Sequence, residues 1–256
     1  SASGLRGIAK DHFTPELIDK YISAFINTQN IKSCVIGRDG RPSGKQIALW
    51  VIDSLHKKGV NVDNCGLATT PTMQIMTEKE NYDGGIVITA SHNPSEYNGL
   101  KFLQNDGTFL SPEKCEELFK AVDQNISVEN SESLGVVSDY STANKEHIHK
   151  VLSAKCIDVE SVIQKKFTVV IDAVNGAGSY ILPTLCEQLG CKVITMNCNG
   201  DGNFTRIPEP LAENLQSLEK KVLEVGADIG FATDPDGDRL SIVSNNGTAI
   251  GEEYSL

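Results

Sequence analysis

Residues 84–94 read Gly-Gly-Ile-Val-Ile-Thr-Ala-Ser-His-Asn-Pro, and this stretch decides how the rest of the chain is interpreted. Its first half is a run of apolar, mostly β-branched residues, which predicts a buried strand. Its second half is polar and contains a proline, which predicts that the strand ends in a turn. Turns at strand ends carry functional groups more often than cores do. Ser91 is therefore a candidate nucleophile. The alternative is that Ser91 and Asn93 only cap the next segment through side-chain hydrogen bonds.

The segments on either side alternate between helical and strand periodicity. Helices are predicted over residues 15–26, 45–58, 112–122, 141–153, 180–189 and 211–225, and strands over residues 33–37, 84–89, 100–104, 168–171 and 192–196. This alternation is typical of an α/β layered fold. The polar residues 123–138 interrupt it and are interpreted as a linker or flap.

A second polar turn, Ala232-Thr233-Asp234-Pro235-Asp236-Gly237-Asp238-Arg239, lies between two apolar runs that predict further strands. Three carboxylates this close raise one another's pKa, whereas a hard divalent cation accepts oxygen ligands and relieves the repulsion. The pattern therefore predicts a Mg²⁺ site formed by Asp234, Asp236 and Asp238.

The turn has two other interpretations. An EF-hand calcium loop needs glycine where the chain has Arg239 and a bidentate glutamate where it has Asn245, so the pattern excludes it. The turn could also be exposed and solvated, with Arg239 paired to one of the aspartates.

Composition restricts the partners. A formal net charge of -11 argues against nucleic acid, which is bound by clustered Lys and Arg. The seven cysteines form no Cys-x-x-Cys pair, as expected of reduced thiols in a cytoplasmic protein. The sequence shows neither a signal peptide nor an apolar stretch long enough to span a bilayer, so no membrane partner is predicted. It predicts no oligomeric state.

The two polar turns together resemble the signature of the α-D-phosphohexomutases, the phosphoglucomutase and phosphomannomutase superfamily. Other segments resemble the family in the order in which it has them: Ser3-Gly4-Leu5-Arg6-Gly7, Gly37-Arg38-Asp39-Gly40-Arg41-Pro42-Ser43-Gly44, Thr69-Thr70-Pro71, Asp172-Ala173-Val174-Asn175-Gly176-Ala177-Gly178 and Pro208-Glu209-Pro210. One departure is Ala2, which stands where relatives usually carry threonine. The resemblance covers essentially the whole chain but only the front half of a typical family member.

The resemblance implies two consecutive three-layer α/β/α domains with mixed, mostly parallel sheets, corresponding to phosphoglucomutase domains I and II. The first is expected over residues 1–138 with the phosphoserine loop, and the second over residues 139–248 with the metal-binding loop. Residues 249–256 are expected to begin a third domain that is missing. Because the family's sugar-reading and C-terminal phosphate-binding loops would lie beyond residue 256, the chain is expected to be a fragment with little or no turnover of its own.

The resemblance also implies the reaction, a reversible phosphoryl transfer between the 1- and 6-positions of a hexose phosphate. Ser91 would carry the phosphate, and a hexose 1,6-bisphosphate would be the intermediate and activator. Mg²⁺ would be held by Asp234, Asp236 and Asp238 together with a phosphate oxygen on Ser91. Such a transfer depends on positioning and charge neutralisation more than on new covalent chemistry.

The cations complete the expected site. The family match assigns the proton transfer to Lys101, with Arg6 as an electrostatic helper, and Arg239 as a substrate contact. Arg38 and, more weakly, Arg41 lie in a Gly-rich turn where a guanidinium can bind phosphate. His92 is expected to contact substrate, because side chains of adjacent residues point apart and His92 is therefore a poor base for Ser91.

Three alternatives remain open. Phosphoglucosamine mutase shares these segments with phosphomannomutase and phosphoglucomutase, so the sugar is not predicted. A metal-dependent sugar phosphatase would pass the phosphoryl group to water. A non-catalytic binding module would keep the fold without a phosphoserine.

Overall fold

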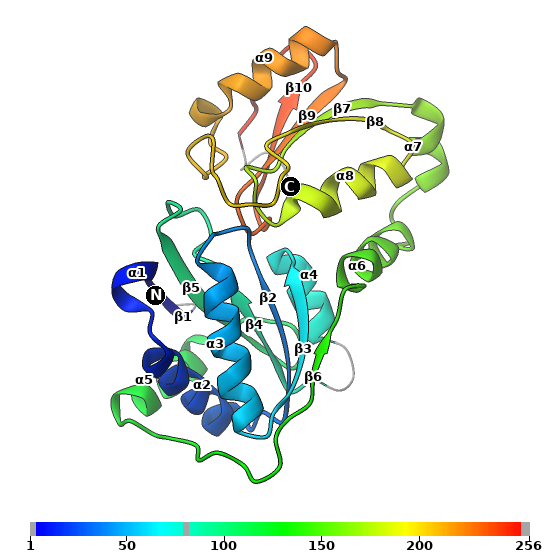
Figure 1. Cartoon of the computed structure of the whole chain (residues 1–256). Coiled ribbons are helices and arrows are strands. Elements are labelled where there is room, and N and C mark those ends of the chain that lie inside the picture. Colours follow the sequence, from blue (N-terminus) through cyan, green and yellow to red (C-terminus); the bar gives the residue numbers. More distant parts are fainter. Residues whose placement is uncertain (1–3, 79–81, 252–256) are drawn as a thin grey trace. The chain divides into compact units, whose positions relative to one another are not determined.

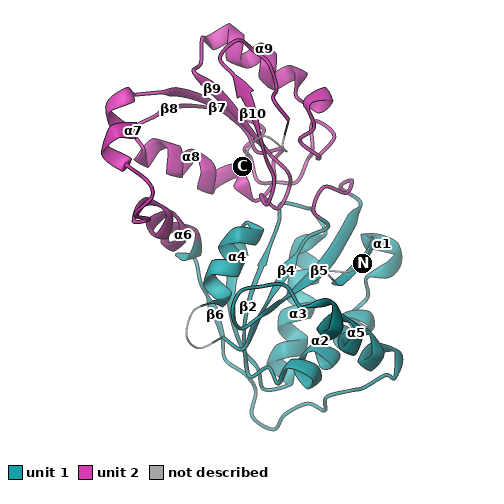
Figure 2. Ribbon diagram, turned by 180° about the vertical axis from the view of Figure 1, so that it is seen from behind, with its two compact units in different colours: residues 1–90, 96–143 teal, residues 91–95, 144–256 magenta. Residues whose placement is uncertain are grey.

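The computed structural model describes residues 4–78 and 82–251 of the chain (Figure 1). Residues 1–90 and 96–143 form one compact unit, and residues 91–95 and 144–256 form a second (Figure 2). Each unit is a layered arrangement of a mixed sheet and helices, so the predicted α/β fold with mostly parallel sheets is confirmed. Ala2, Ser3 of the family-like segment at residues 3–7, and residues 252–256 of the expected third domain lie outside the described residues.

The first unit is built on a six-stranded sheet with the order β1-β5-β4-β2-β3-β6. Its strands are β1 (Gly4–Ile8), β2 (Ser33–Arg38), β3 (Asn61–Leu67), β4 (Gly84–Ile88), β5 (Tyr97–Gln104) and β6 (Val137–Asp139). The pairs β2–β3, β2–β4 and β3–β6 are parallel, whereas β5 runs antiparallel to β1 and β4. All five residues of β4 are buried, which explains the uninterrupted apolar run in its sequence.

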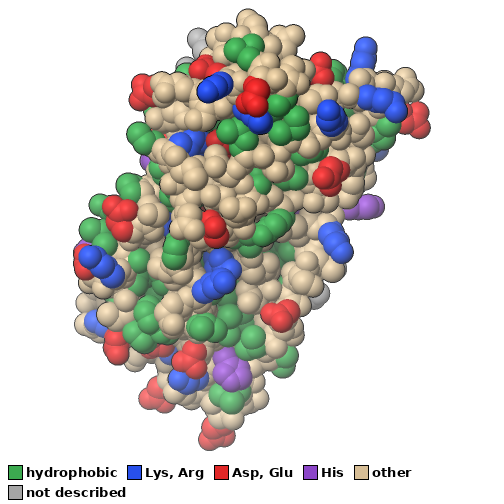
Figure 3. Space-filling model, turned by 45° about the horizontal axis from the view of Figure 1, so that its top comes forward, with side chains coloured by type: hydrophobic (Ala, Val, Ile, Leu, Met, Phe, Trp, Pro, Cys, Tyr) green, Lys and Arg blue, Asp and Glu red, His purple; other side chains and the backbone are tan. Residues whose placement is uncertain are grey.

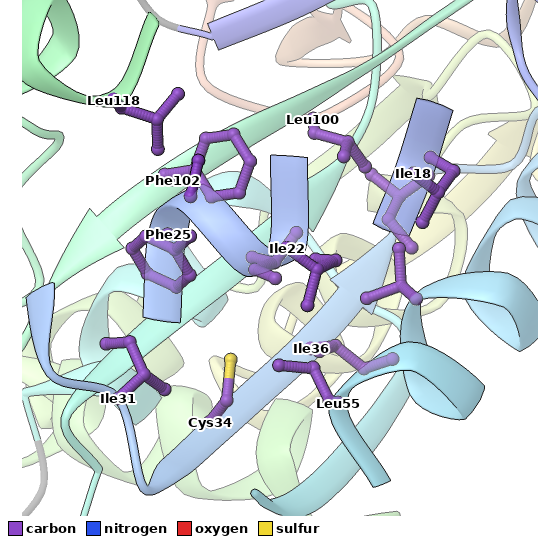
Figure 4. Close-up of a cluster of buried hydrophobic side chains, with 14 of the residues drawn as sticks. Ile18, Ile22, Phe25, Ile31, Cys34, Ile36, Leu55, Leu100, Phe102 and Leu118 are labelled. Carbon is purple, nitrogen blue, oxygen red and sulfur yellow. The ribbon is translucent and has the colours of Figure 1, made fainter. Parts of the chain in front are cut away.

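Helices cover both faces of this sheet, which gives the first unit its three layers. They are α1 (Ala9–His12), α2 (Pro15–Gln29), α3 (Gly44–Lys57), α4 (Thr70–Thr77) and α5 (Pro112–Asp123). On one face α2, α3 and α5 pack on strand residues such as Ile36 and Phe102, and the rings of Phe25 and Phe102 lie 4.8 Å apart (Figure 4). On the other face α4 packs on Val35 and Val87. Because side chains alternate along a strand, Val35 and Ile36 serve opposite layers.

A short sequence signal starts three of these helices. The side chains of Thr14, Thr69 and Ser111 accept hydrogen bonds from backbone N–H groups at 3.2, 3.2 and 3.3 Å, and each helix has proline in its first turn. A hydroxyl cap and a proline that needs no N–H partner are both favourable at a helix start. The local sequence therefore sets where α2, α4 and α5 begin.

The second unit contains a four-stranded sheet with the order β10-β9-β7-β8. Its strands are β7 (Thr168–Asp172), β8 (Lys192–Met196), β9 (Ile229–Thr233) and β10 (Leu240–Ser244), and its helices are α6 (Ala143–Leu152), α7 (Val159–Lys165), α8 (Gly178–Gln188) and α9 (Gln216–Val225), with the 3₁₀ turn η1 (Ala212–Asn214). Leu218 and Val222 of α9 pack with Val170 on one face of the sheet. Leu182 of α8 packs with Ile171 on the other.

Both units contain the same four-strand plan. The order β5-β4-β2-β3 in the first unit corresponds to β10-β9-β7-β8 in the second. In both, the two central strands run parallel and the last two in sequence form an antiparallel hairpin. The hairpin ends also correspond, because Gln104 N–H donates to the Thr108 carbonyl at 2.8 Å and Ser244 N–H to the Thr248 carbonyl at 3.0 Å.

Several segments depart from the sequence-based expectations or add to them. The helix predicted over residues 211–225 is divided into η1 and α9. The sequence did not predict the strands β1, β3 and β6 or the helices α1, α4 and α7. Residues 123–138, interpreted as a linker or flap, run from the end of α5 into β6 and are bonded to α3, because Ser131 N–H donates to the Lys57 carbonyl at 2.8 Å and Gly135 N–H to the His56 carbonyl at 2.9 Å.

One face of the molecule carries charges of both signs. On the face shown in Figure 3, Lys and Arg side chains are interspersed with Asp and Glu. Within the described residues, none of the helices has both the length and the hydropathy needed to cross a bilayer.

Candidate functional site

Ser91 lies on the loop that follows β4, and its contacts group residues 91–95 with the second unit. Its backbone is left-handed, with φ of 52°, and its side chain is almost wholly buried. The Ser91 hydroxyl donates a hydrogen bond to Oδ2 of Asp234 at 3.3 Å. The structure thus brings the predicted nucleophile to the first aspartate of the predicted metal loop.

The three aspartates gather on the turn between β9 and β10. One carboxylate oxygen from each of Asp234, Asp236 and Asp238 lies within 4.8 Å of the others. Asp234 and Asp236 are fully buried, whereas Asp238 is exposed. Backbone N–H groups of Asp238 and Arg239 each donate to Asp234 Oδ1 at 3.2 Å, so the turn folds around the Asp234 carboxylate.

The electrostatics of this cluster favour a bound cation. Burial, and then the negative charges of Asp236 and Asp238, raise the pKa of Asp234 well above its ordinary value. A divalent cation removes this penalty by replacing repulsion with coordination. The three side chains offer only carboxylate oxygens. Hard cations such as Mg²⁺ and Ca²⁺ prefer oxygen ligands, whereas soft metals prefer sulfur. The residues present therefore fit a hard divalent cation.

The turn after β7 packs against the aspartate loop. Val174 and Asn175 both have positive φ, and the Ala177 N–H donates to the Pro235 carbonyl at 2.7 Å. A Cβ atom added at Gly176 would lie 2.4 Å from the Pro235 carbonyl oxygen, so only glycine allows this approach. The sequence indicated a tight turn here, but not that the turn packs on the residue between Asp234 and Asp236.

Glu209 is a residue of this site that sequence reasoning missed. Its Oε1 accepts a hydrogen bond from Nη1 of Arg239 at 2.7 Å. The pair is about one-third exposed, so the guanidinium is held in place and still meets solvent. The Pro208-Glu209-Pro210 segment was noted in the sequence as a family feature, but its partner 30 residues away becomes visible only in the fold.

His92 follows Ser91 on the same loop and is half-buried. Its Nδ1 is buried and has no hydrogen-bond partner among the described residues. Buried polar atoms are nearly always hydrogen-bonded, so an unpartnered ring nitrogen next to a candidate nucleophile is a group available to a ligand.

Lys101, Arg6 and Arg38 belong to the first unit. Lys101 on β5 is buried, and its ammonium nitrogen lies 5.5 Å from the centre of the Phe109 ring. Arg6 on β1 pairs in register with Gly99. Arg38 ends β2 and donates from Nη1 to the Asp39 carbonyl at 2.9 Å. Burial lowers the pKa of the Arg38 guanidinium.

Arg41 has a structural role in this unit. It is fully buried, and its Nε donates to Oδ2 of Asp39 at 2.9 Å while its Nη1 donates to the Tyr97 carbonyl at 3.0 Å. The hydroxyl of Thr89 donates to the same Asp39 oxygen at 2.7 Å. Arg41, the weaker of the two predicted phosphate contacts, thus forms a buried ion pair with Asp39, and Asp39 also holds Thr89, two residues before Ser91.

The chain has two α/β units, and a serine hydroxyl donates to the first of three clustered aspartates. Comparison with known protein families agrees with these features. Residues 1–129 match the model for phosphoglucomutase/phosphomannomutase, alpha/beta/alpha domain I, and residues 145–247 match the model for domain II. The chain therefore belongs to the phosphoglucomutase/phosphomannomutase family.

Relatives and solved structures agree with this assignment. The chain is 39% identical over 260 residues to a phosphoglucomutase/phosphomannomutase of Thermococcus kodakarensis, covering 96% of this chain and 55% of the relative. It is 35% identical over 255 residues to a probable phosphoglucosamine mutase of Methanopyrus kandleri, covering 99% and 55%. A family protein from Burkholderia thailandensis, solved by X-ray crystallography, superimposes with a TM-score of 0.78 at 28% identity, covering 97% of this chain and 55% of that one. The chain thus spans about 55% of the length of these relatives.

Proposed function

We propose that this chain carries the phosphoserine and metal-binding part of a phosphohexomutase, an isomerase that moves phosphate between the 1- and 6-positions of a hexose phosphate. The observation that carries the proposal is the hydrogen bond from the Ser91 hydroxyl to Asp234, the first member of the aspartate cluster. Family membership supports it, since the relatives are named mutases.

Ser91 is the phosphoryl carrier in this proposal, accepting the group from a hexose 1,6-bisphosphate and returning it to the sugar monophosphate. Asp234, Asp236 and Asp238 would hold Mg²⁺ together with a phosphate oxygen on Ser91. When bound, the ion neutralises negative charge on the transferring group. Hydrogen bonds from the Asp238 and Arg239 N–H groups hold the Asp234 carboxylate in place.

The other residues bind substrate or move its proton. His92 offers an unpartnered ring nitrogen, and Arg239 a guanidinium oriented by Glu209, to phosphate or sugar oxygens. Arg38 is proposed to bind phosphate as a bidentate donor. Lys101 is proposed to exchange the proton of the reacting sugar hydroxyl, with Arg6 stabilising the negative charge.

The substrate is proposed to be a hexose phosphate of the glucose, mannose or glucosamine type, because relatives carry names of these kinds. We further propose domains at residues 1–138 and 139–248, with a third beginning at residue 249, and a cytoplasmic protein without nucleic-acid or membrane partners. The net charge of -11 supports the exclusion of nucleic acid.

Intact-mass spectrometry with peptide mapping tests the proposal. The chain is analysed before and after incubation with glucose 1,6-bisphosphate and Mg²⁺, beside the Ser91→Ala variant. We expect one phosphate on the peptide that contains Ser91, and none on that peptide in the variant.

Two results would count against the proposal. No phosphate on the wild-type chain under either condition would contradict the carrier role of Ser91. Stoichiometric release of free phosphate from the bisphosphate would favour a phosphatase.

A further inference from the structure

Arg206 lies beside the aspartate loop and donates hydrogen bonds to the last residues of the neighbouring strands β7 and β9. Its Nε donates to Oδ2 of Asp172 at 3.2 Å, and its Nη2 donates to the Thr233 carbonyl at 2.8 Å. Its Nη1 donates to the carbonyls of Ile207 and Pro208 at 3.0 and 3.3 Å. One guanidinium therefore binds four acceptors.

The positions of two of these acceptors are informative. Thr233 is the last residue of β9, and Asp234 follows it directly. Asp172 is the last residue of β7 and pairs in register with Ala232 of β9. Arg206 thus ties the ends of two neighbouring strands together at the point where the metal loop begins.

Burial strengthens the ion pair between Arg206 and Asp172. The Asp172 side chain is 1% exposed and the Arg206 side chain 10% exposed, so their charge-assisted hydrogen bond is shielded from water. Asp172 is held on its other side, because the Val174 N–H donates to its Oδ1 at 2.9 Å. Removing either partner would leave the other charge buried and unpaired.

We propose that Arg206 is the positioning residue of the metal site. It supplies no ligand, and it sets the place from which Asp234 enters the loop by holding the Thr233 carbonyl. This inference rests on the proposed function, since it assumes that Asp234, Asp236 and Asp238 bind a divalent cation.

Electrostatics and positioning predict opposite effects for this residue. A positive charge near three carboxylates repels an incoming cation, so Coulomb's law alone predicts tighter metal binding when Arg206 is neutralised. Positioning predicts weaker binding, because the carboxylates lose their common geometry. The sign of the change therefore decides between the two.

Lysine cannot replace this arginine. An ammonium group is a point charge on a flexible stem and lacks the planar fork that reaches Asp172 and Thr233 together. Arg206→Lys keeps the charge and loses the fork, so it separates geometry from electrostatics.

The experiment measures divalent-cation affinity by isothermal titration calorimetry with Mg²⁺ and by electron paramagnetic resonance with Mn²⁺. It compares the wild-type chain with Arg206→Gln, Arg206→Lys and the control Lys221→Gln. Lys221 lies on α9 and forms an exposed ion pair with Glu224, so the control removes a positive charge from the same unit without touching the loop. Circular dichroism establishes that each variant is folded.

We expect Arg206→Gln to weaken Mg²⁺ and Mn²⁺ binding by roughly 10-fold or more, the size of effect typical of residues that orient metal ligands. Arg206→Lys should fall between Gln and wild type, and Lys221→Gln should stay within about twofold of wild type, since an exposed pair contributes little. The Mn²⁺ spectrum should broaden in Arg206→Gln as the ligand geometry becomes heterogeneous.

Equal or tighter metal binding in folded Arg206→Gln would overturn the inference. If Arg206→Gln does not fold, wild-type affinity in Arg206→Lys would overturn it in the same way. A wild-type chain that binds no divalent cation would instead contradict the proposed metal site itself, so the two failures are distinguishable.

Discussion

Ser91 holds its hydroxyl against Asp234 in a backbone conformation that a serine rarely adopts. A left-handed residue other than glycine costs about 1–2 kcal/mol, because Cβ approaches the following carbonyl oxygen. The chain keeps this strain at the residue that we propose carries phosphate. Strain of this kind persists only where the surrounding structure determines the conformation, and it is common at functional sites.

This strain predicts different stabilities for two variants that both lack the hydroxyl. Ser91→Gly should be more stable than Ser91→Ala by roughly 0.5–1 kcal/mol, because relief of a left-handed Cβ outweighs the extra freedom that glycine gives the unfolded chain. Urea denaturation of the two variants side by side measures the difference. A more stable alanine variant would show that the left-handed conformation is not strained.

Because the pKa of Asp234 is raised, we expect the stability of the chain to depend on pH when divalent cations are chelated. The pKa of Asp234 is raised above the ordinary value of 3.8, so the folded chain keeps this proton to a higher pH than the unfolded chain does. The protonated Asp234 carboxyl makes its full contribution to stability at a pH below its pKa in the unfolded chain. This contribution is lost as the pH rises through its pKa in the folded chain.

Asp234→Asn, which never carries the charge, should therefore unfold at a higher temperature than wild type in a chelator at pH 8. The difference should shrink as the pH falls toward 4. Thermal unfolding followed by circular dichroism across this range measures it, and saturating Mg²⁺ should reverse the order at pH 8. A variant that is less stable than wild type in the chelator at pH 8 would refute the prediction.

At the scale of elements, the turn after β7 and the metal loop act as one structure. Gly176→Ala would place a methyl group 2.4 Å from the Pro235 carbonyl, a backbone atom that cannot move without displacing Asp234 and Asp236. We expect the variant to lose stability and to bind Mn²⁺ more weakly. Calorimetric titration and thermal unfolding measure the two effects.

Gly226→Ala is the matched control for this variant. It carries φ of 61° but has nothing within 4 Å of an added Cβ, so it should lose stability, by about 1 kcal/mol, without a change in metal affinity. Wild-type affinity in Gly176→Ala would show that the turn does not support the loop.

Some of the helices and strands could be predicted from the sequence, and others could not. Local periodicity predicted a helix over residues 15–26, which the structure extends to Pro15–Gln29, and the strand Lys192–Met196. Strand β3, Asn61–Leu67, was missed because its polar residues give no apolar run. The eight-residue helix α4 was missed because three of its residues are threonine, which is a weak helix former.

The residues of the candidate site also fall into two groups, those that a sequence pattern reveals and those that it does not. Ser91 and the aspartates form contiguous patterns that can be recognised in one stretch of chain. Arg206 and Glu209 act through partners about 30 residues away, and local periodicity does not contain such a contact. The signals in the sequence were Asp172, a carboxylate that ends an apolar strand, and the Pro208-Glu209-Pro210 segment, and neither names its partner.

At the scale of the whole molecule, each unit has hydrophobic clusters of its own. Phe102→Ala removes a fully buried ring that packs on Phe25, which typically costs about 3–5 kcal/mol. We expect the variant to lower the unfolding temperature of the first unit while Mn²⁺ affinity at 20 °C, a property of the second unit, stays at the wild-type value.

Val170→Ala in the core of the second unit provides the comparison for Phe102→Ala. It should lower the unfolding temperature of the second unit and leave that of the first unchanged. A large loss of metal affinity in Phe102→Ala would show that the two cores are not separate.

The four-strand plan that both units share places their functional loops in equivalent positions. Ser91 lies on the loop after β4, Asp234 on the loop after β9, and these are corresponding strands. One copy of the plan fills this position with a hydroxyl and the other with carboxylates. The scaffold thus provides the same loop position twice, and the residues that each copy places there distinguish the proposed phosphoryl carrier from the proposed cation ligands.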